Sequence, residues 1–265
     1  MLGYGEQDKA MSVYFESLGR GPDLVLLHGW AMNGTVWQPV AEQLAEDYCV
    51  HVVDLPGHGK SPATGPLTLD DMVAAVDAAF PWPVHVVGWS LGGAVGTRWA
   101  LAQPDKIRSL TLVASSPCFM QRADWPHAMA EATLGQFAES LAADWRGTLK
   151  RFISLQAMGD AQARAVTRTL ADDLFLHGEP ALGALAEGLD ILRDTDLRTE
   201  MARLVLPVLL QYGDKDTLTP VAAAHWLADA LPLAQCHIHA GAAHAPFLSH
   251  RDEFIAVQKA FLAGA

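Results

Sequence analysis

The sequence predicts an α/β fold, in which a mostly parallel central sheet is flanked by helices and a helical cap is inserted into the sheet domain. Short apolar runs recur along the chain, each followed by Gly, Pro or Asp and then by a longer stretch with helical spacing. This alternation is typical of a parallel sheet covered by helices. After Ala114 the strands stop for about ninety residues, and Ala, Leu and charged residues alternate at helical spacing instead.

The apolar runs mark the expected strands. Each is nearly all apolar, as strands that are covered on both faces must be. They lie at residues 24–27, 50–54, 84–88, 110–114, 208–212 and 236–239.

The helical spacing from Trp125 to Arg198 predicts the inserted cap. We expect residues 1–116 and 199–265 to form the core domain and residues 117–198 to form the cap. A chain of 265 residues commonly folds as one domain with such an insertion.

The composition restricts the classes of partner. Lys and Arg total 18 and Asp and Glu total 30, which gives a net charge of −12. This acidic balance argues against nucleic acid or an anionic membrane as the main partner. The N-terminal stretch has no basic region followed by an apolar run, and no apolar run approaches the roughly 20 residues of a membrane helix. We therefore expect a cytoplasmic protein that acts as a monomer.

The three cysteines give no sign of a disulfide framework or a zinc site. Cys49, Cys118 and Cys236 are odd in number, far apart and without a C-x-x-C pair. We expect small, buried and reduced side chains at these positions.

The strongest chemical signal is the segment Gly88-Trp89-Ser90-Leu91-Gly92, which directly follows an apolar strand and precedes a helical run. A Ser at so sharp a strand-to-helix turn projects its hydroxyl above the sheet, and the flanking glycines let neighbouring backbone approach. The N-terminus of the following helix offers free N–H groups and a positive dipole end. Ser90 is therefore the predicted nucleophile.

A second glycine turn, LHGW at residues 27–30, follows an earlier strand. In this architecture an N–H from that loop and the N–H of the residue after the nucleophile stabilise the oxyanion. The expected donors are the backbone amides of Trp30 and Leu91. We expect His28 to organise the loop by hydrogen bonding and to take no part in catalysis.

The general base is expected late in the chain, because the triad of this architecture follows the order Ser, acid, His. His244 lies in a loop of small residues just after the last expected strand, where backbone can pass close to a site. His237 and His239 fall within that strand and His250 starts the final helix, so we expect these three to be packed or solvated. His244 is the predicted base.

The acid that orients the base is expected on the loop after the strand at 208–212. That loop offers Asp214 and Asp216. One carboxylate is needed to hold the imidazole in the right tautomer and to stabilise its cation, and the other is expected to cap a turn or helix. Spacing alone does not choose between the two.

The segments HGW, DLPGHGKS, GWSLGG, YGDKDTLTP and GAAHAPF together resemble the α/β-hydrolase superfamily over essentially the whole chain. In that superfamily's G-x-x-D-x-x-x-P loop, the catalytic acid is the Asp three residues after the Gly. The resemblance therefore implies Asp216 as the acid. The implied Ser-His-Asp chemistry requires no metal and no dissociable cofactor.

A closer resemblance rests on VASSPCF with DWP and, in the cap, on RF followed by LQAMG. These segments look like the pimeloyl-acyl carrier protein methyl ester esterases of biotin biosynthesis. The resemblance implies hydrolysis of the methyl ester of pimeloyl-acyl carrier protein with release of methanol. It also implies an acyl channel lined by Trp30, Ser90, Leu91, Phe152, Ile153, Ser154, Leu155, Gln156 and His244.

The cap contains a basic stretch, from Arg146 to Arg168, in an otherwise acidic chain. Its basic residues are Arg146, Lys150, Arg151, Arg164 and Arg168, and its lone acid is Asp160. Such a local excess can attract an acidic carrier protein or bind the phosphate of phosphopantetheine, and the alternative is an ordinary solvated helix face. By the resemblance, Arg151, Arg164 and Arg168 fall where the family contacts its carrier, whereas Gly147 replaces another such arginine and Arg146 is adjacent.

Two rival functions stay open at this point. One is another hydrolase on the same fold, such as a broad short-chain carboxylesterase that acts on small-molecule esters or a carbon–carbon bond hydrolase. The other is a non-catalytic binding protein. Dehalogenases and epoxide hydrolases fit less well, because they use an Asp where this chain has Ser90.

Overall fold

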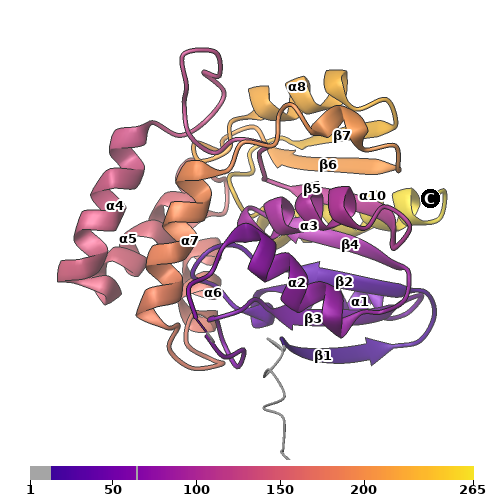
Figure 1. The fold of residues 1–265 in the computed structure, drawn as a ribbon, viewed down its shortest axis with the longest axis horizontal. Coiled ribbons are helices and arrows are strands. Elements are labelled where there is room, and N and C mark those ends of the chain that lie inside the picture. Colours follow the sequence, from indigo (N-terminus) through magenta and orange to yellow (C-terminus); the bar gives the residue numbers. More distant parts are fainter. Residues whose placement is uncertain (1–12, 64) are drawn as a thin grey trace, which may run out of the picture.

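The computed structural model describes residues 13–63 and 65–265, and within them it shows a single sheet flanked by helices (Figure 1). Residues 1–12, which include most of the stretch that we searched for an export signal, lie outside the described residues, as does residue 64. Among the described residues, no helix combines the length and the apolar character that are needed to cross a membrane.

Seven strands form the sheet in the order β1-β3-β2-β4-β5-β6-β7. All neighbouring pairs are parallel except β1 with β3. The predicted α/β fold with a mostly parallel sheet is therefore confirmed. The strands are β1 (Tyr14–Gly19), β2 (Asp23–Leu27), β3 (Cys49–Asp54), β4 (Val84–Trp89), β5 (Ile107–Val113), β6 (Val208–Gly213) and β7 (Ala234–His239).

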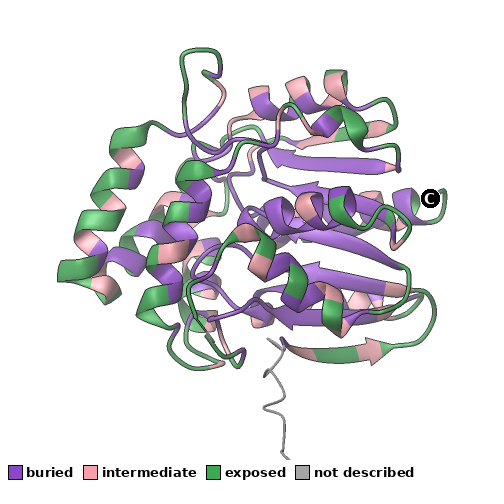
Figure 2. Cartoon of the chain, in the orientation of Figure 1, coloured by how far each residue is buried: buried purple, intermediate pink, exposed green. Residues whose placement is uncertain are grey.

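Two layers of helices cover the sheet. The helices α2 and α3 pack together on one face, and α1 and α10 pack together on the other (Figure 1). Because both faces are covered, the central strands are buried, and every residue of β4 lies in the core (Figure 2). The core-domain helices are α1 (Gln38–Leu44), α2 (Leu69–Ala79), α3 (Leu91–Ala102), α8 (Val221–Ala230), α9 (Pro246–Ser249) and α10 (Arg251–Leu262), with 3₁₀ turns η1 (Gly34–Trp37) and η2 (Met201–Arg203).

The edges of the sheet differ from the sequence prediction. The antiparallel edge strand β1 was not predicted, because its segment YFESLG mixes polar and apolar residues and is only partly buried. Strand β7 was expected to be covered on both faces, but it is the opposite edge of the sheet, with two residues exposed and three half-buried. Strand β5 ends at Val113, and Ala114, the predicted last residue, has a left-handed φ of 43°.

Four helices, α4 (Glu131–Ala143), α5 (Trp145–Gln156), α6 (Ala163–Asp173) and α7 (Leu182–Asp194), lie together on the side to which the parallel strands point (Figure 1). The chain leaves the sheet after β5 and returns to it at β6. At the stem of this excursion Cys118 pairs with Asp196, and the amide of Leu197 donates a hydrogen bond of 2.8 Å to the carbonyl of Pro117. The segment before α4, residues 114–130, is irregular and not helical.

The three cysteines are free, as the sequence predicts. The expectation that all three are buried is wrong for two of them. Cys118 is buried, but Cys49 is only half-buried and Cys236 is exposed on the edge strand β7.

Candidate active site

Ser90 lies at the sharp turn between β4 and α3 and has a left-handed φ of 54°. Two glycines make this turn feasible. A Cβ on Gly88 would collide with the carbonyl of Gly92, and a Cβ on Gly92 would collide with the carbonyl of Leu27. The amide of Ser90 donates to the carbonyl of Val113 at 3.0 Å. The strained turn is therefore held by the sheet and directs Ser90 to the edge that faces the cap.

The two expected oxyanion donors lie at the start of α3 and on the loop after β2. Leu91 is the first residue of α3, so its amide has no acceptor within the helix. Within the described residues, neither the Leu91 amide nor the Trp30 amide donates a hydrogen bond to another protein group. Both N–H groups are therefore available to a ligand.

His28 organises the loop that contains Trp30, as expected. Its Nε2 accepts from the amide of Leu55 at 2.9 Å, so Nδ1 carries the proton and donates to the carbonyl of Gly29 at 2.8 Å. The pKa of His28 is lowered to about 3, and burial is the largest cause of this shift. The ring is thus neutral at pH 7, and both of its nitrogens are occupied by the loop.

The Trp30 side chain connects this loop to the cap. Its indole N–H donates to the carbonyl of Leu185 on α7 at 2.9 Å, and the ring packs edge-on against Phe152 of α5 at 4.8 Å between centroids. Gly188 on α7 is needed for this contact, since a Cβ there would approach the indole to 2.6 Å. The backbone and the indole of Trp30 therefore have separate partners.

His244 and Asp216 form a buried pair. The Nδ1 of His244 lies 2.8 Å from Oδ2 of Asp216, and both side chains are almost completely shielded from solvent. The carboxylate also accepts hydrogen bonds from the amides of Leu218 and Thr219 and from the Thr219 hydroxyl. These donors fix the carboxylate, which in turn fixes the imidazole with its proton on Nδ1 and leaves Nε2 free as a base.

Asp214 has a different place. Its carboxylate accepts a hydrogen bond from the amide of Gly241 at 2.7 Å and pairs with Lys215 at 3.0 Å. These bonds lower the pKa of Asp214, with the Gly241 amide as the largest cause. Asp214 therefore supports the loop that leads to His244 and does not contact its ring. It does not cap its own turn as expected, because the amides of Leu218 and Thr219 bond to Asp216 instead.

Trp89 joins the turn at Ser90 to the loop at His244. Its indole N–H donates to the carbonyl of His244 at 2.8 Å, and the two rings lie 5.6 Å apart between centroids. Because Trp89 directly precedes Ser90, this bond holds the candidate nucleophile and the candidate base in neighbouring positions. No local sequence pattern predicts this contact, because Trp89 and His244 are so distant along the chain.

The profile of the family described as "alpha/beta hydrolase fold" matches residues 22–251. The chain belongs to the α/β hydrolase family. Within this family it belongs with proteins named pimeloyl-[acyl-carrier protein] methyl ester esterase. The protein of that name from Chromobacterium violaceum is 46% identical over 92% of this chain and 96% of its own length. The one from Aeromonas salmonicida is 44% identical over 95% of this chain and its full length. Both predicted resemblances are confirmed.

Solved structures show the same fold at lower identity. An esterase from Exiguobacterium antarcticum has a TM-score of 0.85 and 22% identity, and each chain is covered to 95%. A bromoperoxidase from Bacillus anthracis has a TM-score of 0.89, also with 22% identity and 95% coverage of each chain. Their different activities illustrate that this fold alone does not determine the reaction.

The cap of this α/β hydrolase is bonded directly to the loop that carries His244. The amide of His244 donates to the carbonyl of Gln156 at 3.0 Å, and the amide of Ala243 donates to the carboxylate of Asp160 at 2.8 Å. A third bond runs from the amide of Ala161 to the carbonyl of Gly241. Asp160 is the lone acid of the basic stretch from Arg146 to Arg168. Its position in the sequence alone does not indicate that it bonds to the loop of His244.

The predicted channel residues of α5 divide by burial. Phe152, Ile153 and Gln156 are buried and Leu155 is half-buried, whereas Ser154 is exposed and bonds to the carbonyl of Lys150 in its own helix. The structure therefore does not bring Ser154 to the interior. Within the described residues, the buried Nε2 of Gln156 has no hydrogen-bond partner, so this donor is available to a bound molecule.

A pocket of about 510 Å³ lies between the cap and the acid loop. Leu155 and Met158 line it from the cap, and Asp216 and Leu218 line it from the core. Ser90 is largely shielded from solvent and is not part of this lining. Of the three candidate catalytic residues, Asp216 is the one that borders this pocket.

The predicted carrier-contacting arginines, Arg146, Arg151, Arg164 and Arg168, are all exposed on α5 and α6. Arg146 stacks on Trp145 and pairs with Glu179, which lies outside the basic stretch from Arg146 to Arg168. Arg168 is 3.8 Å from Asp172, and both of these side chains are mostly exposed. Such exposed pairs are weak, so the positive charges remain accessible to a partner.

Proposed function

We propose that this protein is a serine carboxylesterase that hydrolyses the methyl ester of pimeloyl-acyl carrier protein methyl ester, giving pimeloyl-acyl carrier protein and methanol in biotin biosynthesis. The observation that carries the substrate assignment is the similarity, at 42–46% identity over nearly the full length, to proteins with this name. The buried His244–Asp216 pair beside the turn at Ser90 supports the reaction type.

The proposed reaction uses the triad. His244 Nε2 removes the proton of Ser90 as Oγ attacks the ester carbonyl, and Asp216 holds the Nδ1–H and stabilises the imidazolium. The amides of Trp30 and Leu91 stabilise the oxyanion. Collapse of the intermediate expels methoxide, which leaves as methanol with the proton from His244. Water activated by His244 then attacks the acyl enzyme and releases the carboxylate and free Ser90.

The cap supplies the proposed substrate selection. Phe152, Ile153 and Leu155 provide apolar surface for the acyl chain, and the unpartnered amide of Gln156 provides a donor for a substrate oxygen. Arg151, Arg164 and Arg168 are the proposed contacts to the carrier. Arg146, which pairs with the exposed Glu179, is a fourth proposed contact.

The proposal also includes the organisation and location of the protein. Residues 117–198 act as a cap on a core formed by residues 1–116 and 199–265, and the stem at Pro117 and Leu197 supports this division. A substrate on an intracellular carrier implies a cytoplasmic protein. The expected monomeric state stays a prediction.

Growth without biotin tests the function. We expect the wild-type chain to restore growth to a strain that lacks its own pimeloyl methyl ester esterase, and we expect Ser90→Ala to fail at equal expression. If the wild-type chain is well expressed and hydrolyses p-nitrophenyl esters but restores no growth, the protein is a broad carboxylesterase and our substrate assignment is wrong.

A further inference from the structure

A group of potential metal ligands lies at the edge strand β7 and the start of α10, outside the triad. His237 and His239 are two residues apart on β7, so their side chains share a face. Glu253 of α10 approaches both, with 2.8 Å from Oε1 to the Nε2 of His237 and 3.4 Å from Oε2 to the Nδ1 of His239. The three ligand atoms all lie within 4.8 Å of one another.

A buried chain of hydrogen bonds fixes the tautomer of His239. The Nε2 of Gln258 donates to the Thr111 hydroxyl, and the Nε2 of Gln211 donates to Oε1 of Gln258, each at 3.0 Å. The Oε1 of Gln211 is therefore the acceptor that faces His239, whose Nε2 donates to it at 3.1 Å. The proton of the neutral ring is thus on Nε2, and Nδ1 carries a lone pair.

This lone pair has no hydrogen-bond partner among the described residues, although the His239 side chain is fully buried. It faces a carboxylate oxygen of Glu253, so two electron-rich atoms oppose each other at 3.4 Å. A cation between the two atoms relieves this repulsion.

We propose that His237, His239 and Glu253 bind a zinc ion. Two imidazole nitrogens and a carboxylate are a ligand set that zinc favours, with the fourth tetrahedral position left to water. Bond lengths near 2.1 Å place tetrahedral ligand atoms roughly 3.3 Å apart, close to the separation of His239 and Glu253. His237 and Glu253 are partly exposed, so they can separate slightly and admit the ion.

The ion has a structural role in this proposal. It joins β7 to the N-terminal turn of α10, and Gln211 acts as the outer partner that orients His239. Zinc then stabilises the folded chain, because the three ligands are brought together only in the folded state. This inference does not depend on the proposed esterase function.

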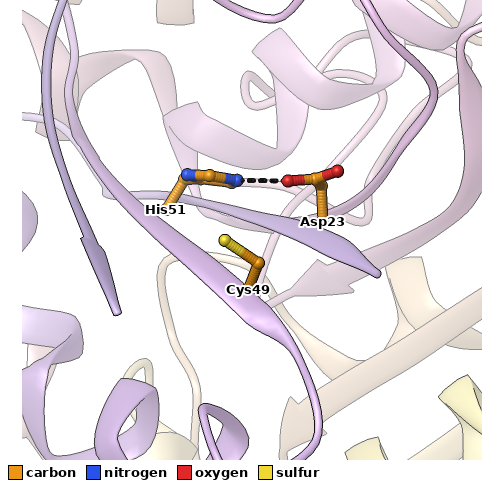
Figure 3. A group of neighbouring side chains, drawn as sticks. All are labelled: Asp23, Cys49 and His51. Atoms are coloured by element: carbon orange, nitrogen blue, oxygen red, sulfur yellow. Dashed lines mark hydrogen bonds and ion pairs between the residues drawn. The ribbon is translucent and has the colours of Figure 1, made fainter. Parts of the chain in front are cut away.

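A second group, Asp23, Cys49 and His51, offers a contrast (Figure 3). The Nε2 of His51 is bonded to Asp23 at 2.8 Å, as the dashed line in Figure 3 shows, and Nδ1 is bonded to the hydroxyl of Ser17 at 2.7 Å. Both ring nitrogens are thus satisfied. The pKa of the Cys49 thiol is raised, and burial is the largest cause of this shift. The raised pKa disfavours the thiolate form that zinc requires. This group serves as the control.

Zinc titration of the chelator-treated full chain, in competition with a chromogenic chelator, tests the site. We expect one equivalent to bind, with affinity at least about tenfold weaker in Glu253→Gln and in His237→Gln, and unchanged in the control Asp23→Asn. Both main variants alter partly exposed side chains, so folding is retained and is checked by circular dichroism. Zinc should raise the Tm of the wild type and of the control but not of the double variant Glu253→Gln/His237→Gln.

The proposal is overturned if the wild type binds zinc no more tightly than the double variant. It is equally overturned if Asp23→Asn abolishes binding, because the ion then occupies the group in Figure 3. Cobalt(II) gives an independent readout. We expect an intense tetrahedral absorption spectrum in the wild type that is lost in Glu253→Gln, and a weak octahedral spectrum in the wild type contradicts the assigned geometry.

Discussion

Ser90 combines a left-handed backbone with a shielded side chain, and its proposed general base, His244, lies 154 positions later in the chain. The bond from Trp89 to the carbonyl of His244 is what holds these two residues near each other. Because nucleophile and base act as one unit, removal of either disables the same step.

We therefore expect Ser90→Ala and His244→Ala each to lower kcat by about 10⁴-fold or more, and the double variant to be little worse than either. Steady-state kinetics on a p-nitrophenyl ester measures all three. Losses that multiply in the double variant would show that the two residues act independently.

The two carboxylates of the acid loop are expected to differ sharply. Asp216→Asn leaves the geometry in place but favours the wrong tautomer of His244, and the corresponding change in a serine protease lowers kcat about 10⁴-fold. Asp214→Asn should cost little turnover, because its oxygen can still accept from the Gly241 amide. If Asp214→Asn causes the larger loss of kcat, the acid has to be reassigned.

Sequence patterns identify some of the candidate site residues but not all of them. Local spacing was sufficient to identify the turn at Ser90, since its glycines and the strand before it are contiguous. It did not separate Asp214 from Asp216, because only the folded loop determines which carboxylate meets His244. The resemblance to the α/β-hydrolase superfamily implied Asp216, whereas spacing alone left both residues open.

At the scale of elements, the connection between α5 and α6 supports the loop of the candidate base. Removing the buried carboxylate of Asp160 leaves the Ala243 amide without an acceptor. A hydrogen bond to a charged group contributes about 1.5–3 kcal/mol, so misplacement of His244 in Asp160→Ala should lower kcat by at least about tenfold.

Three comparisons separate positioning from general stability. Asp160→Asn should recover much of the activity, because its amide oxygen can accept the same bond, and the exposed control Asp172→Ala should match the wild type. The rate of labelling at Ser90 by a fluorophosphonate should fall together with kcat in Asp160→Ala. If labelling stays at the wild-type rate, Asp160 does not position the base.

The arginines of α5 and α6 are expected to affect encounter with the carrier. Replacing Arg151, Arg164 and Arg168 by Ala should lower kcat/KM for the carrier-linked ester at low salt, with a smaller deficit at high salt, because exposed charge acts mainly on association. Hydrolysis of a free p-nitrophenyl ester should barely change. Equal losses on both substrates would mean that these residues hold the cap together.

Element boundaries were predictable where the pattern was local. The central strands are continuous apolar runs and were found, whereas β1 and β7 are edges whose mixed burial leaves a weak pattern. The weak pattern of β7 also gives no sign that His237 and His239 are candidate zinc ligands. His237 and His239 were interpreted as packed or solvated residues, and only the pairing of β7 with β6 and the approach of Glu253 bring out the free lone pair.

At the scale of the whole molecule, buried histidines make stability depend on pH. Burial is the largest cause of a lowered pKa in each of four histidines, His28, His58, His85 and His239. In the unfolded chain these rings titrate near pH 6.5, so the unfolded state takes up protons first as the pH falls. Their contribution is complete above pH 6.5 and is lost as the pH falls toward the folded values.

We expect the free energy of unfolding to decrease from pH 7 to pH 5, by up to about 1.4 kcal/mol per pH unit for each of these four rings. Urea denaturation in chelator-containing buffer measures this slope. His85→Gln should reduce this slope, and the exposed control His225→Gln should leave the slope unchanged. A stability that is constant from pH 7 to pH 5 would contradict the assignment.

The cap leaves and rejoins the core at adjacent points, where Pro117 and Leu197 are hydrogen-bonded. An insertion whose two ends already meet does not require the strands on either side of it to move, so β5 and β6 pair as they would around a short loop. Exchange of this insertion for another at the stem would keep the pairing of β5 with β6, but it would remove the bonds that Gln156, Asp160 and Ala161 make with the loop of His244. A transplanted insertion therefore has to supply equivalent bonds before a new substrate range can be combined with the same core.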